Sequence, residues 1–154
     1  RTLPRAHFLT QDPRYLEAAV LACNFSNGAN PDNIVYTTGL GSYFPTSPLH
    51  IDSRVSGQPA PAGITIYGPS DPDGDFAFND WVHQWRLSGS MTPDSRSWPA
   101  SESHVNLFGW PSMSEYTIHQ TIIPTSYHWG YLAGVAGYVE PEEEPPSKEN
   151  PGDS

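Results

Sequence analysis

The clearest helical pattern in the sequence begins at Asp12-Pro13. Asp12 can cap a helix, and Pro13 suits the first turn because an N–H there has no intrahelical acceptor. The apolar residues that follow fall on one helical face: Leu16, Ala19, Val20 and Cys23. Gly28 then supplies a stop. The pattern therefore predicts a helix from about Pro13 to Asn27.

Two more helical segments are predicted toward the C-terminus. Ser112 to Glu115 has the form of a capping box, in which a serine and a glutamate three residues later satisfy the first N–H groups of a helix. Apolar residues follow, and Pro124 should end or kink this helix because it lacks an N–H. A third helix is predicted from Thr125 to about Tyr138.

Short extended segments and long loops should fill the middle of the chain. Ile34–Thr38 and Ile64–Tyr67 have the composition of brief strands. Gly, Pro and polar residues dominate 39–63 and 88–111, which predicts long ordered loops. Residues 140–154 contain no apolar residue and should form a disordered acidic tail or linker. The pattern as a whole predicts a mainly α fold with little β structure, whose working residues lie on long ordered loops.

Charge narrows the class of ligand. Lys and Arg number 7 against 17 Asp and Glu, a formal net charge of −10. This excludes a nucleic-acid partner and an anionic membrane surface, both of which require a basic face, and leaves neutral ligands such as sugars. Cys23 is the only cysteine, so neither an internal disulfide nor a cysteine-rich zinc site is expected.

An acidic turn around residues 71–75 resembles a metal-binding loop in part. Asp71, Asp73 and Asp75 alternate as in a calcium loop, but the distant glutamate that completes an EF-hand is absent. A solvated acidic turn explains the three residues better, so no metal site and no structural calcium are predicted from them.

Aromatic residues and one glutamate supply the candidate chemistry. Sugars stack on aromatic rings, and four of the five tryptophans lie in or beside loops: Trp81, Trp85, Trp98 and Trp110. The alternative is that these side chains simply pack in the core. Glu115 stands between Trp110 and Tyr116, and an apolar setting raises a carboxyl pKa so that the group can act as an acid. Its alternative role is the helix cap with Ser112, where a helix N-terminus favours the charged form.

An ordered series of short motifs resembles a known family. The motifs are Gly28-Ala29-Asn30-Pro31, Tyr36-Thr37-Thr38-Gly39-Leu40-Gly41, Pro48-Leu49-His50, Gly68-Pro69 and Ser114-Glu115-Tyr116-Thr117. In order and rough spacing, over about residues 13–138, the chain resembles the C-terminal part of the family-nine glycoside hydrolases, which are cellulase-like and endoglucanase-like enzymes.

The resemblance implies a fold and a reaction. The fold would be a barrel of six α-helical hairpins, of which residues 1–139 would supply only the last helices and the loops above them. The enzyme would cleave a β-linked glucan or related polysaccharide with inversion, without an organic cofactor, and would be secreted, cell-surface or periplasmic. The catalytic base is expected upstream of residue 1, so the upstream half of the domain is an implied partner.

The resemblance also implies roles for residues. Glu115 would be the general acid, and the substrate-binding residues would be His50, Arg54, Trp98, Trp110 and Tyr116. The sequence departs from the family pattern after His50, where Ile51 and Asp52 stand in place of a second histidine or an arginine. The family's aspartate upstream of the glutamate is replaced, Asn106 being nearest to its place.

Two other interpretations stay open. A protein of the same fold could keep the aromatic groove, lose the chemistry and serve as a carbohydrate-binding or structural extracellular protein. The chain could also be an unrelated extracellular domain that forms a compact unit by itself. Part of a helical barrel, by contrast, should expose apolar helix faces.

Overall fold

A computed structural model describes residues 2–70, 89, 92–94, 97–109 and 111–137. It is mainly helical, with 48% helix, which confirms the predicted class. Pairing of extended backbone in these residues is limited to two isolated bridges, Asn27 with Val35 and Thr37 with Thr65. Several predictions lie outside the described residues: those for Trp81, Trp85, Trp110, the acidic turn and the 140–154 tail.

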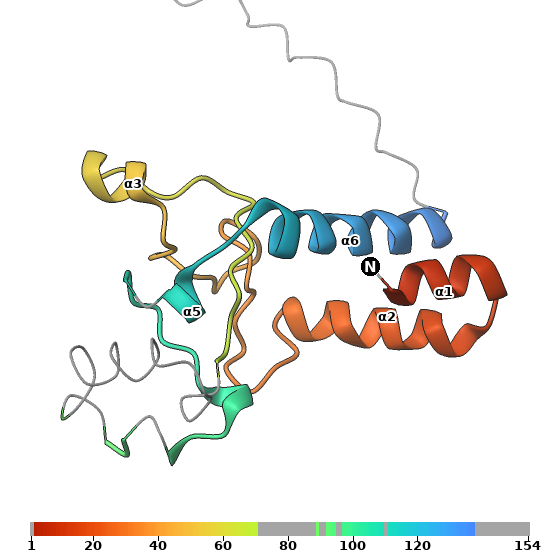
Figure 1. Ribbon diagram of the computed structural model, residues 1–154, viewed down its shortest axis with the longest axis horizontal. Helices are drawn as coiled ribbons and strands as arrows, with labels where there is room; N and C mark the ends of the chain where they lie inside the picture. Colours follow the sequence, from red (N-terminus) through yellow and green to blue (C-terminus); the bar gives the residue numbers. More distant parts are fainter. Residues whose placement is uncertain (1, 71–88, 90–91, 95–96, 110, 138–154) are drawn as a thin grey trace, which may run out of the picture.

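Three helices lie side by side at one end of the molecule (Figure 1). Helix α1 (Thr2–Thr10) and helix α2 (Pro13–Ser26) run antiparallel, and α6 (Ile123–Val135) packs along α2. A hydrogen bond of 2.7 Å between His7 Nδ1 and the Tyr131 hydroxyl ties α1 to α6. We call these three helices the helical layer. The α2 prediction is confirmed; α1 was not predicted.

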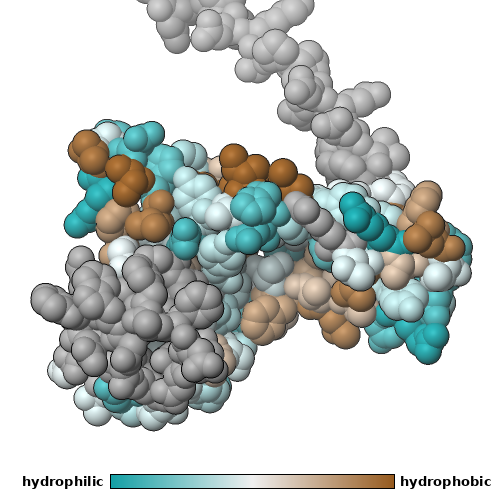
Figure 2. Space-filling view, in the orientation of Figure 1, coloured by the Kyte–Doolittle hydropathy of each residue, from teal (hydrophilic) through white to brown (hydrophobic). Residues whose placement is uncertain are grey.

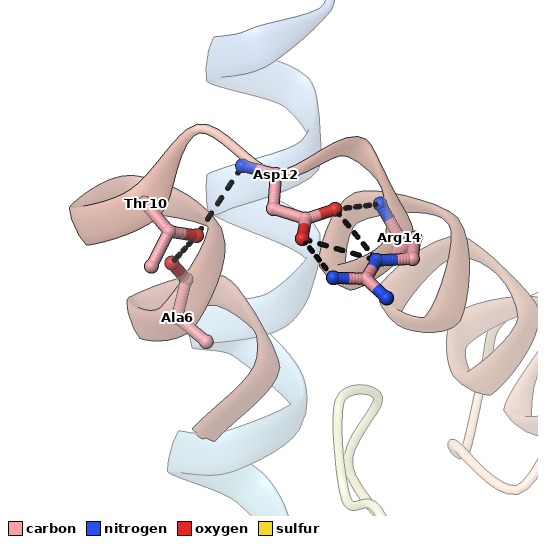
Figure 3. A network of polar contacts seen from close by, with 4 residues as sticks. All are labelled: Ala6, Thr10, Asp12 and Arg14. Atoms are coloured by element: carbon pink, nitrogen blue, oxygen red, sulfur yellow. Dashed lines mark hydrogen bonds and ion pairs between the residues drawn. The ribbon is translucent and has the colours of Figure 1, made fainter.

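The turn between α1 and α2 shows the predicted cap (Figure 3). Asp12 Oδ1 accepts from the backbone N–H of Arg14 at 3.0 Å, and its carboxylate also receives the Arg14 guanidinium. These hydrogen bonds from Arg14 lower the pKa of Asp12 to about 2. The Asp12 N–H donates to Thr10 Oγ1, which closes the turn on α1. The α1–α2 connection is therefore held by polar contacts within a few residues.

The apolar core lies in the other half, among the loops. Its buried members are Ile34, Tyr36, Ile64 and Ile66. The two extended segments face each other through backbone hydrogen bonds, from Thr38 N to Ile64 O at 2.9 Å and from Ile66 N to Tyr36 O at 3.0 Å. Both short extended predictions are thus confirmed in outline. We call residues 27–70 together with 97–117 the loop region.

Residues from two of the family-like motifs, Gly28–Pro31 and Tyr36–Gly41, stabilise turns in this region. Asn30 is buried, and its side-chain amide donates to Phe25 O at 2.7 Å and to Ile34 O at 2.8 Å, so it holds the turn after α2. Gly39 adopts a φ of +73°, and a Cβ there would lie 2.6 Å from the Cβ of Ala62. Only glycine fits that position without displacing the neighbouring backbone.

A short helix interrupts the predicted 39–63 loop, which corrects that prediction. Helix α3 spans Ile51–Ser56. His50 caps it, since its Nδ1 accepts from the Ser53 N–H at 3.2 Å, and Gly57 ends it with a φ of +69°. Histidine is an unusual cap, so the ordinary start signals are absent. A second short helical turn, of 3-10 type, lies at Ala100–Glu102.

The predicted capping box at Ser112 is wrong. Helix α5 spans Pro111–Ser114, so Glu115 follows a helix instead of opening one. The next helical segment begins at a π turn, Ile118–Ile122, whose cap is Thr117, with Oγ1 accepting from Gln120 N at 3.1 Å.

The π turn ends at Ile122 and α6 begins at Ile123, so one helical segment ends and the next begins beside Pro124, as predicted. The third predicted helix, from Thr125 to about Tyr138, corresponds to α6. Pro124 occupies the first turn of α6, where a backbone N–H would have no acceptor within the helix.

Candidate functional site

Glu115 lies where separate loop segments converge. The carbonyl oxygens of residues 113–115 accept three backbone hydrogen bonds, from Gly68 N at 3.4 Å, Leu49 N at 2.7 Å and Tyr67 N at 2.9 Å. These are the carbonyls that a short helix leaves unsatisfied at its end. Loops from two earlier parts of the chain therefore fix the backbone of Glu115, and no helix-capping role remains for its carboxylate.

A pocket of about 220 Å³ opens beside this point, between α3, the loop before it and Phe108. Hydroxyl and amide side chains, one arginine, one histidine and one aromatic ring line it. The described lining residues are Thr46, Ser47, Pro48, His50, Ser53, Arg54, Gly57, Gln58, Ala60 and Phe108. We call it the α3 pocket. Its lining mixes hydrogen-bonding groups with an aromatic surface, which is the chemistry that suits a sugar.

Asn106 holds one wall of the α3 pocket in place. Its Oδ1 accepts from Thr46 N at 3.1 Å and from Ser47 N at 2.9 Å, and its Nδ2 donates to Thr46 Oγ1 at 2.7 Å. All three partners belong to a segment far away in sequence. Asn106 therefore positions a loop of the pocket. It is also the residue nearest to the place of the aspartate in the family pattern.

Ser53 and Tyr116 hold the His50 ring in place at the pocket wall. Nδ1 lies 3.2 Å from the Ser53 backbone N–H donor and 2.6 Å from Ser53 Oγ. The ring also lies 6.4 Å from that of Tyr116, tilted by 30°. His50 therefore contributes a fixed polar ring to the lining of the α3 pocket.

Arg54 lies one turn after His50 on α3. Its guanidinium lies over the Phe108 ring, 5.2 Å from the centroid, a cation–π contact. Of the predicted substrate-binding residues, His50 and Arg54 line the α3 pocket together, and Tyr116 contacts His50. Phe108, Ser53 and Gln58 were not predicted. The helical spacing of Ser53 to His50 was a signal that could have found the first of the hydroxyls once α3 was known.

The remaining predicted residues lie elsewhere. Glu115 is half-buried and does not line the α3 pocket. Its neighbour Tyr116 lies against the lining residue His50, and its neighbour Ser114 accepts from Leu49, which precedes His50 in the chain. Trp98 is half-buried, donates from Nε1 to Pro93 O at 3.2 Å, and does not line the pocket either. Trp110 lies outside the described residues.

Titratable groups next to the core are held neutral. Burial, with Asp32 nearby, raises the pKa of the Tyr36 hydroxyl, which donates to the Asp32 carboxylate at 3.2 Å. Burial lowers the pKa of His104, whose ring meets the Tyr36 ring edge-on at 5.4 Å. Both groups are therefore uncharged near neutral pH and serve as packing beneath the loops.

A second pocket, of about 150 Å³, lies between α2 and α6 and includes Cys23, His128 and Trp129 in its lining. Burial raises the pKa of the Cys23 thiol and lowers that of His128. The thiol form of cysteine is a poor nucleophile. This pocket is therefore a weaker candidate for chemistry than the α3 pocket.

In the described part of the chain, no set of three or more His, Cys, Asp or Glu residues is grouped to hold a metal ion. No described helix has the length and apolar character needed to cross a membrane. The chain has no match among known protein families, curated proteins or solved structures.

Proposed function

We propose that this chain supplies the general acid, Glu115, of a glycoside hydrolase that cleaves a β-linked glucan or related polysaccharide with inversion. The observation that carries the proposal is the placement of Glu115 beside the α3 pocket. Its neighbour Ser114 accepts from Leu49 in the loop that leads to His50, and its other neighbour Tyr116 lies against the His50 ring. The backbone of Glu115 is thus joined to the loop that leads into a polar, aromatic-walled pocket.

In this proposal Glu115 fills one of the two carboxyl roles that the reaction needs. Inverting hydrolysis needs one carboxylic acid to protonate the departing oxygen and a second carboxylate to activate water on the opposite face of the sugar. We place the second carboxylate in an upstream half of the same domain, which would complete a barrel of six helical hairpins. The exposed apolar faces of the helical layer support such a partner. Because polysaccharides are met outside the cytoplasm, we also propose a secreted or cell-surface location.

The test compares proteins that differ in one carboxyl group. Release of reducing ends from soluble β-glucans would be measured for this chain, for the longer protein that includes its upstream half, and for the longer protein with Glu115→Gln. We expect activity in the longer wild-type protein only, and a loss of roughly 10²–10⁴-fold in Glu115→Gln, the usual contribution of a general acid. Glu17→Gln, an exposed carboxyl on α2, is the matched control and should keep full activity.

A change of leaving group separates acid catalysis from binding. An aryl glucoside with an acidic phenol needs little protonation, so Glu115→Gln should lose much less activity on it than on a glucan. Equal losses on both substrates would contradict the acid role. Near-normal activity of Glu115→Gln on a glucan would reject the proposal.

A second candidate is carbohydrate binding without cleavage. The observation that favours it is that Glu115 does not line the α3 pocket, whereas His50 and Arg54 do. In that case the longer protein would bind oligosaccharides and release no reducing ends. His50→Ala would weaken this binding, and Glu115→Gln would not.

A further inference from the structure

The α3 pocket offers hydrogen-bond donors and no carboxylate. None of its described lining residues is acidic. Arg54 has donors only. Asp52 stands two residues before Arg54, and side chains two apart on a helix do not face each other. The cation of Arg54 therefore lines the pocket without an acidic residue among its described neighbours there.

The guanidinium of Arg54 is held by stacking alone in the described structure. It lies over Phe108, and the one ion pair among the described residues joins Arg14 to Asp12, on the helical layer. Stacking occupies the face of the guanidinium and leaves its N–H edge for another partner. That edge is a planar fork, which matches a carboxylate with two parallel hydrogen bonds.

From these contacts we propose that the α3 pocket binds a sugar unit that carries a carboxylate, a uronic acid, with Arg54 as the carboxylate-binding residue. The inference rests on the proposed function and names its substrate class. The chain's net charge of −10 opposes a densely charged polymer. The substrate is therefore a mainly neutral β-glycan with occasional uronic acids.

The test is a comparison of three matched ligands by titration calorimetry. The first is a β-linked glucose tetrasaccharide, the second has one unit oxidised at C6 to the carboxylate, and the third has a C6 sulfate. The protein is the longer form that includes the upstream half, in a Glu115→Gln background so that no ligand is cleaved. We expect the carboxylate ligand to bind tighter than the neutral one by roughly 10- to 100-fold, the range of a charge-assisted hydrogen bond.

Variants of the pocket assign that preference to Arg54. Arg54→Gln should abolish the preference while the neutral ligand binds nearly as before, and Arg54→Lys should keep only part of it because the fork is lost. Arg5→Gln, an exposed cation on α1, removes the same charge elsewhere and should change nothing.

Four outcomes overturn the proposal. Equal loss of neutral and acidic ligands in Arg54→Gln would show that Arg54 binds hydroxyl groups. No loss for either would remove Arg54 from the binding site, and preference for the sulfate alone would exclude the carboxylate. Turnover of neutral glucan without acid selectivity would keep the hydrolase and reject the uronic-acid site. Selective binding by a protein that cleaves nothing would instead support the uronic-acid site and reject the hydrolase.

Discussion

The loop region contains a cluster of buried apolar side chains, whereas the helical layer buries few, although both regions also expose some apolar residues. Helix α2 buries only Ala19 and Cys23, and α6, although largely apolar, buries no residue at all. The loop region holds the core of Ile34, Tyr36, Ile64 and Ile66. In most domains the apolar stripes of helices form the core and loops cover it. Here the loops pack on themselves, and the helices present apolar surface outward.

The helical layer exposes several apolar side chains. Separate brown patches mark it on the face shown in Figure 2. Exposure reaches 79% for Leu9, 67% for Phe8 and 62% for Leu21. Surfaces of this kind are usually covered by a further protein segment. The contrast therefore separates a region that has its own buried cluster from helices whose apolar residues are largely exposed.

Shortening one apolar side chain in each region should give the largest difference in free energy of unfolding. Ile34→Ala, in the loop core, should lower the free energy of unfolding by roughly 2–5 kcal/mol because it leaves a cavity. Leu21→Ala, on the exposed face of α2, should change it by less than about 0.5 kcal/mol. Urea unfolding of the chain followed by tryptophan fluorescence measures both. Equal losses would mean that the helical layer shares a core with the loops.

A glycine pair inside the loop region sharpens the same comparison. Gly39 and Gly57 have similar positive φ values, +73° and +69°, but only at Gly39 would a Cβ meet another atom within 3 Å. Gly57→Ala should cost about 1 kcal/mol for backbone strain alone, and Gly39→Ala about 2–4 kcal/mol because overlap with Ala62 is added. Thermal unfolding of the two variants gives the difference. Matching melting temperatures would show that the 39–62 contact is not close.

The smallest effect is expected within the helical layer. Tyr131→Phe removes the hydrogen bond to His7 and should cost about 1 kcal/mol. The loss should speed amide hydrogen exchange in α1 and leave the loop region unchanged. Tyr127→Phe, an exposed position on the same helix, serves as the control. Faster exchange in residues 64–68 of Tyr131→Phe would show that the two regions unfold as one.

Local signals were sufficient for α2 and α6 and insufficient for α1 and α3. Asp12 and Pro13 made the start of α2 readable, because cap and first turn lie next to each other in sequence. Helix α1 has no such signal; its buried residues are Pro4 and His7, and a contact with distant Tyr131 stabilises it. Helix α3 has only six residues and a histidine cap, so its pattern was too short to separate from loop.

The candidate site was predictable in part for the same reason. His50 and Arg54 are four residues apart, and the resemblance named both before α3 was known. Phe108 and Asn106 are more than fifty residues away in sequence from the residues they contact at the pocket. No local sequence pattern predicts such long-range contacts. The Ser112–Glu115 capping pattern misled, because backbone hydrogen bonds from Leu49 and Tyr67 decide the conformation there.

The convergence of distant segments on residues 113–115 has a consequence for the order of folding. Helices α1 and α2 form from neighbours in sequence and can appear early. The hydrogen bonds from Leu49 and Tyr67 to this segment require the chain to close long loops first, and such contacts slow folding. The backbone of Glu115 is therefore fixed only once these long-range contacts have closed, so its position depends on segments far away in sequence.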